Sequence, residues 1–592
     1  MTLPDYHAGS RQAPIDCVQD KLLSTQCDKL RHTEGADQKT VGKTEGLSIN
    51  VYRIVNNFVN IISRTVAATK SRAIGDLAAG PRPNIQGKVP VKLLHLSRAA
   101  LIGYLLLAGG VSAQTALKAD FKPAGSDWWP EGKQFDPSRS YTFPNAHGQI
   151  RLLSSGTRGS LTNLFFDGIG NNGRGCVTCH QPADAMSLSV KSIQARWQQT
   201  KGADPLFDVS DGANCPDKPR GVESSHSLLL NRGLFRISRD WPGLDIEGRP
   251  FKPNFKIEVV RDPTGCNTSP IYGLFSKTPK ISVFRRPRPA ANLPFIEAVG
   301  FPYDPKTGMP LARDPETRQY VSEALMADSR ALTLAHQAED ALQSHMQIPP
   351  GDSAELLRAL VGLERSLYTA QSHDRWGNAL SGDVTNGGPE FLSRQQPGTL
   401  QSAKVPIWNE FFGWKESKDP NPDVRAFRQS VARGAELFSR RMFLVKDSAG
   451  VNDTIFGNPV RNSCAMCHNM MTSGIDTAPG RVDVGNGNPD FSRVDPELPL
   501  FRIQCDKDAR PHAFLGRNFL THDPGYALTT GKCEDVGKIV TQQLRGLAAR
   551  APYFSNGSAK MLRDIVDMYD RRYNIRFSEQ EKTDLVNLLS VL

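Results

Sequence analysis

The sequence has no apolar run long enough to cross a membrane and no tract of concentrated basic charge. The apolar run Ala99–Gly110 falls well short of the roughly 20 residues that a membrane-spanning helix needs. Residues 1–113 carry 14 Lys+Arg against 8 Asp+Glu, which leaves 58 against 53 in residues 114–592. Because so small a surplus forms no basic patch, we expect no nucleic-acid partner. We also expect no stable membrane span in the mature chain.

The N-terminal residues combine a polar stretch with a short segment that resembles an export signal. Residues 1–87 show no sustained apolar period, and we expect them to be disordered or a mis-annotated extension. Residues 88–113 have the basic start, short apolar run and small-residue end of a secretory signal peptide. An uncleaved membrane anchor is the alternative. Cleavage near Ala113 would leave the mature chain in the periplasm.

Two short motifs carry the clearest chemical signal. Cys176-Val-Thr-Cys179-His180 and Cys464-Ala-Met-Cys467-His468 both read C-x-x-C-H. This spacing attaches a c-type haem, because one helical turn sets both sulfurs toward the haem vinyl groups and the histidine reaches the iron. The alternative is a zinc site with four thiolates, but zinc knuckles are separated by far fewer residues. The motifs predict two covalently bound c-type haems, with His180 and His468 as iron ligands.

The remaining cysteines are even in number. Without the two in residues 1–87 and the four in the motifs, those left are Cys215, Cys266, Cys505 and Cys533. An oxidising compartment favours disulfides between them. Local pairing predicts Cys215–Cys266 and Cys505–Cys533.

Helical periodicity predicts a mainly α fold. Apolar residues recur at helical spacing in 334–346, 356–367 and 431–438, and again in 585–589 after a capping box at Ser578 and Glu581. Residues 238–320 are dense in proline and polar residues, which predicts loops and short strands. We expect two haem domains like class I cytochromes c, with long loops and few short strands. The predicted boundaries are 114–385 for the N-terminal domain, 386–425 for a linker and 426–592 for the C-terminal domain.

Three features resemble the bacterial superfamily of di-haem cytochrome c peroxidases and MauG. They are the order of the two motifs, the segment from Leu544 to Ser558 and the terminal helix from Gln580 to Leu589. The resemblance implies that hydrogen peroxide binds at the N-terminal haem. Electrons would enter through the C-terminal haem from a small carrier protein, a cytochrome c or a cupredoxin. It also leaves open a homodimer and a bound calcium ion, for which Pro552 would offer a carbonyl.

The same resemblance suggests ligands and pocket residues. Tyr569 or Met568 would lie opposite His468 at the second haem, unless both only pack their helix. Gln337 and His345 match the positions of the peroxide pocket, where a histidine could accept and return a proton or bind the iron itself. A histidine that merely lies on an amphipathic helix is the alternative for His345. His226 and His336 are weaker candidates.

The tryptophan that bridges the haems in relatives has no clear counterpart. Phe301 stands near its position, and Trp241 lies at a compatible spacing. Our first prediction of function is a peroxidase-like oxidoreductase. The alternatives are a MauG-like or oxygenase-like enzyme that oxidises a protein or an organic substrate, and an electron-transfer cytochrome without an open iron site.

Overall fold

The computed structural model describes residues 127–592, except for short gaps. The gaps are 157–162, 246–247, 301–312, 315–317, 319–320, 352–353, 383, 396–409, 469–479 and 490–493. All described residues belong to one compact unit, 117–592. The predicted extension and signal peptide, residues 1–113, lie outside the described residues.

The helices over Leu334–Ser344, Ala354–Ser366, Pro422–Arg440 and Glu579–Leu589 overlap the predicted apolar periods, whereas the helix Leu293–Gly300 lies in the region predicted to hold loops and short strands. The helices within the described residues are α3 (Cys176–Cys179), α4 (Val190–Thr200), α5 (Ser227–Arg232), α6 (Leu293–Gly300), α7 (Leu334–Ser344), α8 (Ala354–Ser366), α9 (Pro389–Ser393), α10 (Pro422–Arg440), α11 (Cys464–Cys467), α12 (Ala527–Thr530), α13 (Leu562–Tyr573) and α14 (Glu579–Leu589). The capping box at Ser578 is present, because its hydroxyl accepts from the Glu581 N–H and the Glu581 carboxylate accepts from the Ser578 N–H.

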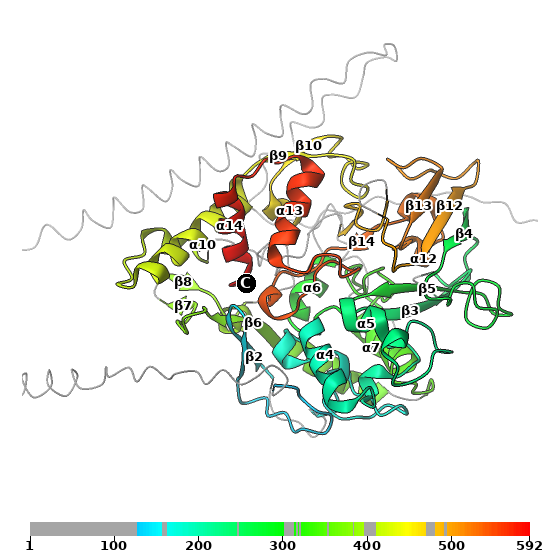
Figure 1. Ribbon diagram of the computed structural model, residues 1–592, viewed down its shortest axis with the longest axis horizontal. Helices are drawn as coiled ribbons and strands as arrows, with labels where there is room; N and C mark the ends of the chain where they lie inside the picture. Colours follow the sequence, from blue (N-terminus) through cyan, green and yellow to red (C-terminus); the bar gives the residue numbers. More distant parts are fainter. Residues whose placement is uncertain are drawn as a thin grey trace, which may run out of the picture. The chain divides into compact units, whose positions relative to one another are not determined.

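Helix α10 crosses α14 at very short range (Figure 1). Gly434 makes this approach possible, because a Cβ at this position would lie 2.1 Å from the Asp584 carbonyl oxygen. Asp584 also accepts hydrogen bonds from Ser430 and Arg433 of α10. The absence of a side chain at Gly434 therefore allows the two helices to pack closely.

The strands form small sheets between the helices. Their bounds are β1 (Tyr141–Asn145), β2 (Gly148–Ser154), β3 (Phe235–Asp240), β4 (Phe255–Arg261), β5 (Lys280–Arg285), β6 (Leu367–His373), β7 (Ser381–Gly382), β8 (Thr385–Asn386), β9 (Phe443–Val445), β10 (Val460–Asn462), β11 (Arg481–Val482), β12 (Leu500–Cys505), β13 (Asn518–Thr521) and β14 (Ile539–Val540). The described sheets have two or three strands, in the orders β1-β2-β6, β13-β12-β4, β3-β5, β10-β9, β11-β14 and β7-β8.

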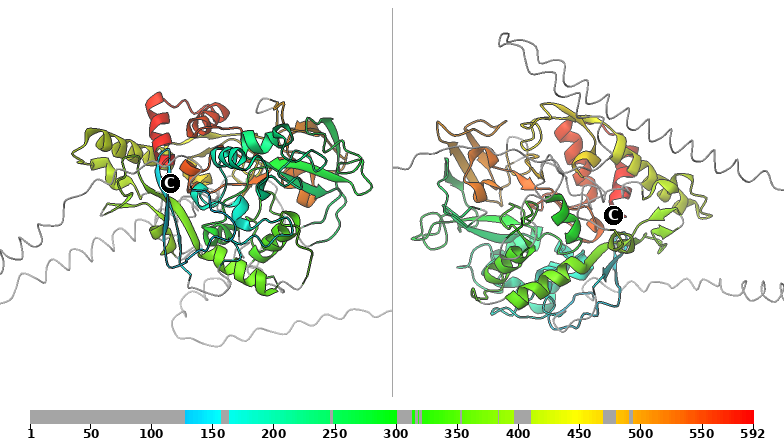
Figure 2. Two further views of the ribbon diagram at one scale, coloured as in Figure 1. Left: turned by 60° about the horizontal axis from the view of Figure 1, so that its bottom comes forward. Right: turned by 180° about the vertical axis from the view of Figure 1, so that it is seen from behind.

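One sheet joins distant parts of the chain. Strand β4 pairs antiparallel with β12, with Ile257 opposite Ile503 (Figures 1 and 2). These strands come from the two predicted haem domains, and the predicted linker contains α9 and the start of α10. The largest core likewise combines Phe295 and Tyr368 with side chains of α10, α13 and α14. The division into two class I-like domains stays a prediction.

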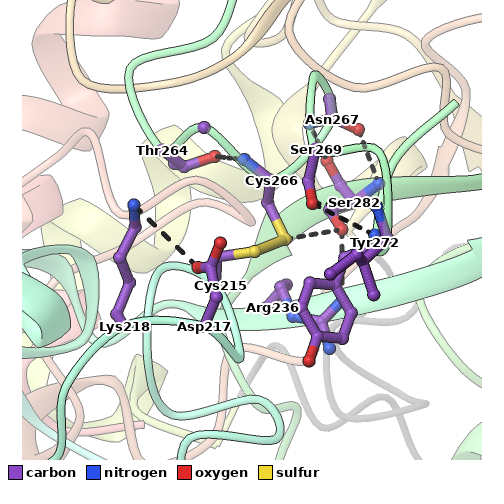
Figure 3. Close-up of a disulfide and its surroundings, with 12 residues drawn as sticks. Cys215, Asp217, Lys218, Arg236, Thr264, Cys266, Asn267, Ser269, Tyr272 and Ser282 are labelled. Carbon is purple, nitrogen blue, oxygen red and sulfur yellow. Dashed lines mark hydrogen bonds and ion pairs between the residues drawn. A yellow bond between two sulfur atoms is a disulfide. The ribbon is translucent and has the colours of Figure 1, made fainter. Parts of the chain in front are cut away.

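Both predicted disulfides are confirmed. Cys215–Cys266 ties the loop after η3 (Pro205–Phe207) to the loop after β4, and both sulfurs are fully buried (Figure 3). Cys505–Cys533 joins the end of β12 to the short helix η8 (Cys533–Asp535). Among the described residues, no helix is long and apolar enough to cross a membrane.

Candidate functional site

The first C-x-x-C-H motif forms a single helical turn, α3. Neither Cys176 nor Cys179 is in a disulfide. The His180 N–H donates to the Cys176 carbonyl at 3.0 Å, which closes the turn. The Thr178 hydroxyl accepts from the Gly175 N–H at 3.0 Å and fixes the start of the turn. The turn therefore holds two free thiols and a histidine in a defined arrangement.

The ring of His180 is oriented for metal ligation. Its Nδ1 lies 2.9 Å from the Met186 carbonyl oxygen, and because a carbonyl only accepts, Nδ1 carries the proton. The Nε2 lone pair then points away from this bond. Burial lowers the pKa of His180 to about 4, so the ring is neutral at neutral pH. A neutral imidazole with its other nitrogen held by a carbonyl is the usual state of a histidine ligand.

The predicted pocket residues share a cavity with this motif. This first cavity is lined by Cys176, Cys179 and His180 together with Gln337 and His345. Gln337 comes from α7, and His345 follows the last turn of the same helix. The first motif and the residues Gln337 and His345, which are more than 150 positions apart in the chain, thus line the same cavity.

His345 is fixed by a buried ion pair. Its Nδ1 lies 2.5 Å from Asp211 Oδ2, and Asp211 Oδ1 lies 2.5 Å from an Arg174 guanidinium nitrogen. Burial opposes ionisation of Asp211, but the charge of Arg174 and the bond from His345 lower its pKa to about 2. The ionised carboxylate can only accept, so Nδ1 donates to it, and in the neutral form of the ring the lone pair is on Nε2. Arg174 also donates to the His345 carbonyl at 3.2 Å.

Glu364 of α8 also lines the first cavity. Its side chain is buried, and its Oε2 has no hydrogen-bond partner in the described part of the chain. Burial, with repulsion from Glu297, raises the pKa of Glu364 to about 8. The carboxyl is therefore protonated at neutral pH. Glu364, Asp211 and Arg174 are not among the site residues that the sequence predicts, although Glu364 interrupts the apolar face of its helix one turn after Leu360.

The second motif faces a second cavity, which contains only one of its two candidate ligands. Cys464, Cys467, His468 and Tyr569 line this cavity, and Met568 is not among its described lining residues. The Tyr569 hydroxyl, on α13, lies 3.2 Å from His468 Nε2. Burial raises the pKa of Tyr569 well above its usual value, so it is a neutral phenol. The geometry brings Tyr569, not Met568, opposite the histidine.

Three weaker candidates lie outside both cavities. His226 is fully buried beside Trp197, with its ring nitrogens 3.0 Å from the carbonyls of Val222 and Phe207. His336 lies on α7, with its Nε2 3.9 Å from Asp314. Trp241 packs against Phe255 in a separate cluster. Phe301 lies outside the described residues.

The residues present fit a c-type haem at each motif. Each cavity offers two thiols and a histidine in mostly apolar surroundings, which is the donor set of this cofactor. The zinc alternative would need four thiolates around one ion, but the two pairs face different cavities. Within the described ranges, no group of three or more His, Cys, Asp and Glu side chains is placed to hold a metal ion.

Comparisons with known proteins give a distant but specific match. No protein-family model matches the chain. The cytochrome-c peroxidase IdrP1 of Pseudomonas sp. (strain SCT) is 25% identical over 218 residues, which cover 34% of this chain and 48% of that protein. The crystal structure of a MauG-like protein associated with microbial copper homeostasis is 13% identical, with 51% of this chain and 80% of that chain covered at a TM-score of 0.21. The chain spans about half the length of the curated relative that it matches. The peroxidase match confirms that the chain resembles the superfamily of di-haem cytochrome c peroxidases and MauG.

Proposed function

We propose that this chain is an exported di-haem c-type cytochrome that reduces hydrogen peroxide to water in the periplasm. One haem would be bound through Cys176, Cys179 and His180 in the first cavity, and the other through Cys464, Cys467 and His468 in the second. Two electrons and two protons break the O–O bond and yield two water molecules. A small cytochrome c or cupredoxin would supply the electrons. The bound haem iron supplies the redox chemistry, and the protein supplies ligands, protons and a shielded site.

The observation that carries this proposal is the position of His345 in the first cavity. His180 would hold the iron from one side, and His345 and Gln337 line the same space. Because Asp211 engages Nδ1, the lone pair on Nε2 of His345 is left to take a proton from bound peroxide. The same nitrogen would return that proton to the leaving oxygen. Arg174 keeps Asp211 ionised and so keeps His345 in this tautomer.

The lone pair on Nε2 also allows His345 to bind the iron directly. In that case the first haem would be closed until reduction released His345. The two arrangements differ in spin state, because a haem with two histidine ligands is low-spin and a haem with an open position is high-spin. Both are compatible with peroxide reduction.

The surroundings of the second motif support electron entry there. Five large apolar side chains that are at least 42% exposed come from the residue before β9, from β9 itself, from the loop between β9 and β10, and from α11. They are Met442, Leu444, Ile455, Phe456 and Met466. If these side chains form one contiguous patch, that patch is of the kind that marks protein-docking surfaces. Small, weak interfaces are what electron-transfer partners use.

The experiment compares peroxide turnover and electron paramagnetic resonance (EPR) spectra of the wild type and His345→Gln, with a reduced cytochrome c as donor. We expect His345→Gln to lower kcat by about 10²–10⁴, the usual contribution of a general acid–base residue. The EPR spectra of the as-isolated and half-reduced protein then tell whether His345 was an iron ligand.

The matched control is His336→Gln, which alters a histidine of the same helix outside the cavity. We expect it to keep wild-type turnover. If His345→Gln keeps both wild-type turnover and the wild-type EPR spectrum, His345 has no role at the iron and the proposal is wrong. Two low-spin haems that never react with peroxide in any redox state would instead identify an electron-transfer cytochrome.

The position of Tyr569 favours a second candidate, a MauG-like or oxygenase-like oxidation of a protein or an organic substrate. A tyrosine opposite His468 is the ligand that the resemblance links to MauG, whereas Met568 would indicate a high-potential electron carrier. Oxidation of an added substrate without oxidation of the donor cytochrome would favour this function. Calcium binding and a homodimer stay predictions.

A further inference from the structure

Several buried arginines have carboxylate partners. Arg174 pairs with Asp211, and Arg285 pairs with Asp328 at 2.7 Å. Arg545 forms two bonds with Glu410, at 2.8 and 3.0 Å, and both side chains are 1% exposed. In each case a buried negative charge offsets the buried positive one, as buried charges require.

Three other arginines, of which Arg550 is buried and Arg286 and Arg288 are half-buried, donate side-chain hydrogen bonds only to backbone carbonyls among the described residues. Arg286 donates to the carbonyls of Arg232, Leu188 and Arg550. Arg288 donates to those of Ala324, Met326 and Thr541. Arg550 donates to that of Gln543, and its Nε is buried without a partner. A carbonyl dipole does not neutralise a guanidinium charge.

The pKa values of these three arginines reflect the lack of a bonded carboxylate among the described residues. Burial, with repulsion from Arg550, lowers the pKa of Arg286 to about 9, and burial lowers the pKa of Arg288 and Arg550 to about 10. Asp184 attracts the charge of Arg286 and Asp328 that of Arg288, but both carboxylates form their hydrogen bonds with other groups. Asp184 accepts from the Ser189 N–H and the Ser192 hydroxyl, and Asp328 accepts from Arg285 and Arg330.

The three arginines lie where the two cavities meet. Arg288 lines the first cavity, Arg550 lines the second, and Arg286 lines both. Pro287 and Ala327 also line both cavities, so the segment of Arg286 and Pro287 forms a shared wall. Unpaired positive charge is therefore concentrated between the two proposed haem sites.

We propose that these arginines bind the propionate carboxylates of the two haems. Arg288 would bind a propionate of the first haem, Arg550 one of the second, and Arg286 a propionate at the shared wall. Guanidinium groups match carboxylates in shape and charge, and such pairs are stronger than neutral hydrogen bonds. The inference rests on the proposed attachment of a haem to each motif, but not on the reduction of peroxide.

The proposal predicts which potential each arginine controls. A positive charge beside a haem favours the reduced state, because reduction removes one positive charge from the iron. We expect Arg288→Met to lower the reduction potential of the first haem, Arg550→Met that of the second, and Arg286→Met both. Spectroelectrochemical titration measures the potentials, and EPR spectra at partial reduction assign them. The pyridine haemochrome spectrum first confirms that two haems are bound.

The matched control removes a buried arginine together with its carboxylate. The double variant Arg545→Gln, Glu410→Gln changes no net charge, so both potentials should equal those of the wild type. If the three Met variants also keep the wild-type potentials, the arginines do not bind propionates. Potentials that vary with acetate concentration at fixed ionic strength would show that a solution anion is the partner, which also overturns the proposal.

A second measurement applies if a Met variant fails to fold. Arg286→Lys, Arg288→Lys and Arg550→Lys keep the charge but lose the planar guanidinium. We expect each to shift the propionate bending bands in the resonance Raman spectrum. Unchanged bands in the folded Lys variants overturn the assignment. None of these experiments measures peroxide turnover. The binding of propionates by the arginines can therefore be refuted while the proposed peroxide reduction holds, and peroxide reduction can be refuted while the propionate binding holds.

Discussion

Gly434 offers the sharpest test of how the region around the second C-x-x-C-H motif is packed. The change is Gly434→Ala in the middle of α10. The added Cβ would lie 2.1 Å from the Asp584 carbonyl oxygen and 3.0 Å from Leu588 Cβ. A backbone oxygen cannot rotate away, so α14 itself must move. That movement also strains the bonds from Arg433 and Ser430 to the Asp584 carboxylate.

The expected magnitude follows from two opposing effects. Overpacking costs about 1–3 kcal/mol, and contact with a backbone atom belongs at the upper end of that range. Alanine gains about 1 kcal/mol over glycine in a helix interior. We therefore expect Gly434→Ala to lower the free energy of unfolding by about 2 kcal/mol.

Gly362 provides the matched control. It lies in the interior of α8, and a Cβ there would meet no atom within 4 Å. Gly362→Ala should gain the helix propensity without a clash, so its free energy of unfolding should rise by about 1 kcal/mol. The two identical substitutions should thus differ in sign and by about 3 kcal/mol.

Urea unfolding of the full haem-loaded chain measures the difference, followed by far-ultraviolet circular dichroism and by Soret absorbance. The two probes report helix loss and release of the haem surroundings. A Gly434→Ala variant as stable as Gly362→Ala would refute the reasoning, because it would show that the two helices have room for a methyl group.

Two further predictions concern pH and the disulfides. Because the pKa of Glu364 is raised from 4.5 to about 8, the native state keeps a proton that the unfolded chain loses, and stability falls as pH rises between these values. Glu364→Gln should remove this fall of stability with pH. Relative to the wild type, its free energy of unfolding should be nearly equal at pH 4.5 and higher by about 4–5 kcal/mol at pH 8. Urea unfolding that gives the same pH dependence for both proteins would contradict this prediction. Cys505→Ser, Cys533→Ser opens a loop with a sequence separation of 28 residues. This double variant should lower the free energy of unfolding by about 3–4 kcal/mol. If the wild type unfolds at the same urea concentration with and without a reducing agent, the disulfides do not stabilise the fold to this extent.

The sequence predicts those parts of the molecule that depend on neighbouring residues. The C-x-x-C-H turns, the helix after Ser578 and both disulfides all have local signals, namely spacing, a capping box and chain proximity. The close helix packing at Gly434 also has a local signal, because a glycine beside apolar residues on one helix face allows another backbone to approach closely.

The parts that could not be predicted depend on distant contacts. His345 and Asp211 are 134 positions apart, and no local pattern links them. Met568 and Tyr569 are neighbours on one helix, so periodicity cannot tell which of them faces the cavity. Arg286, Arg288 and Arg550 could not be predicted to lack a carboxylate partner, because the sequence does not show which side chains lie near an arginine in the fold.

The pairing of β4 with β12 has a consequence for how the chain can be made. A growing chain cannot pair β4 with β12 until about residue 505 has emerged, long after the first motif. Contacts between such distant segments fold slowly, and β4 presents an unpaired edge in the meantime. A fragment that ends near residue 385 would keep that edge open permanently. We expect such a fragment to aggregate, so the first haem site has to be studied in the complete chain.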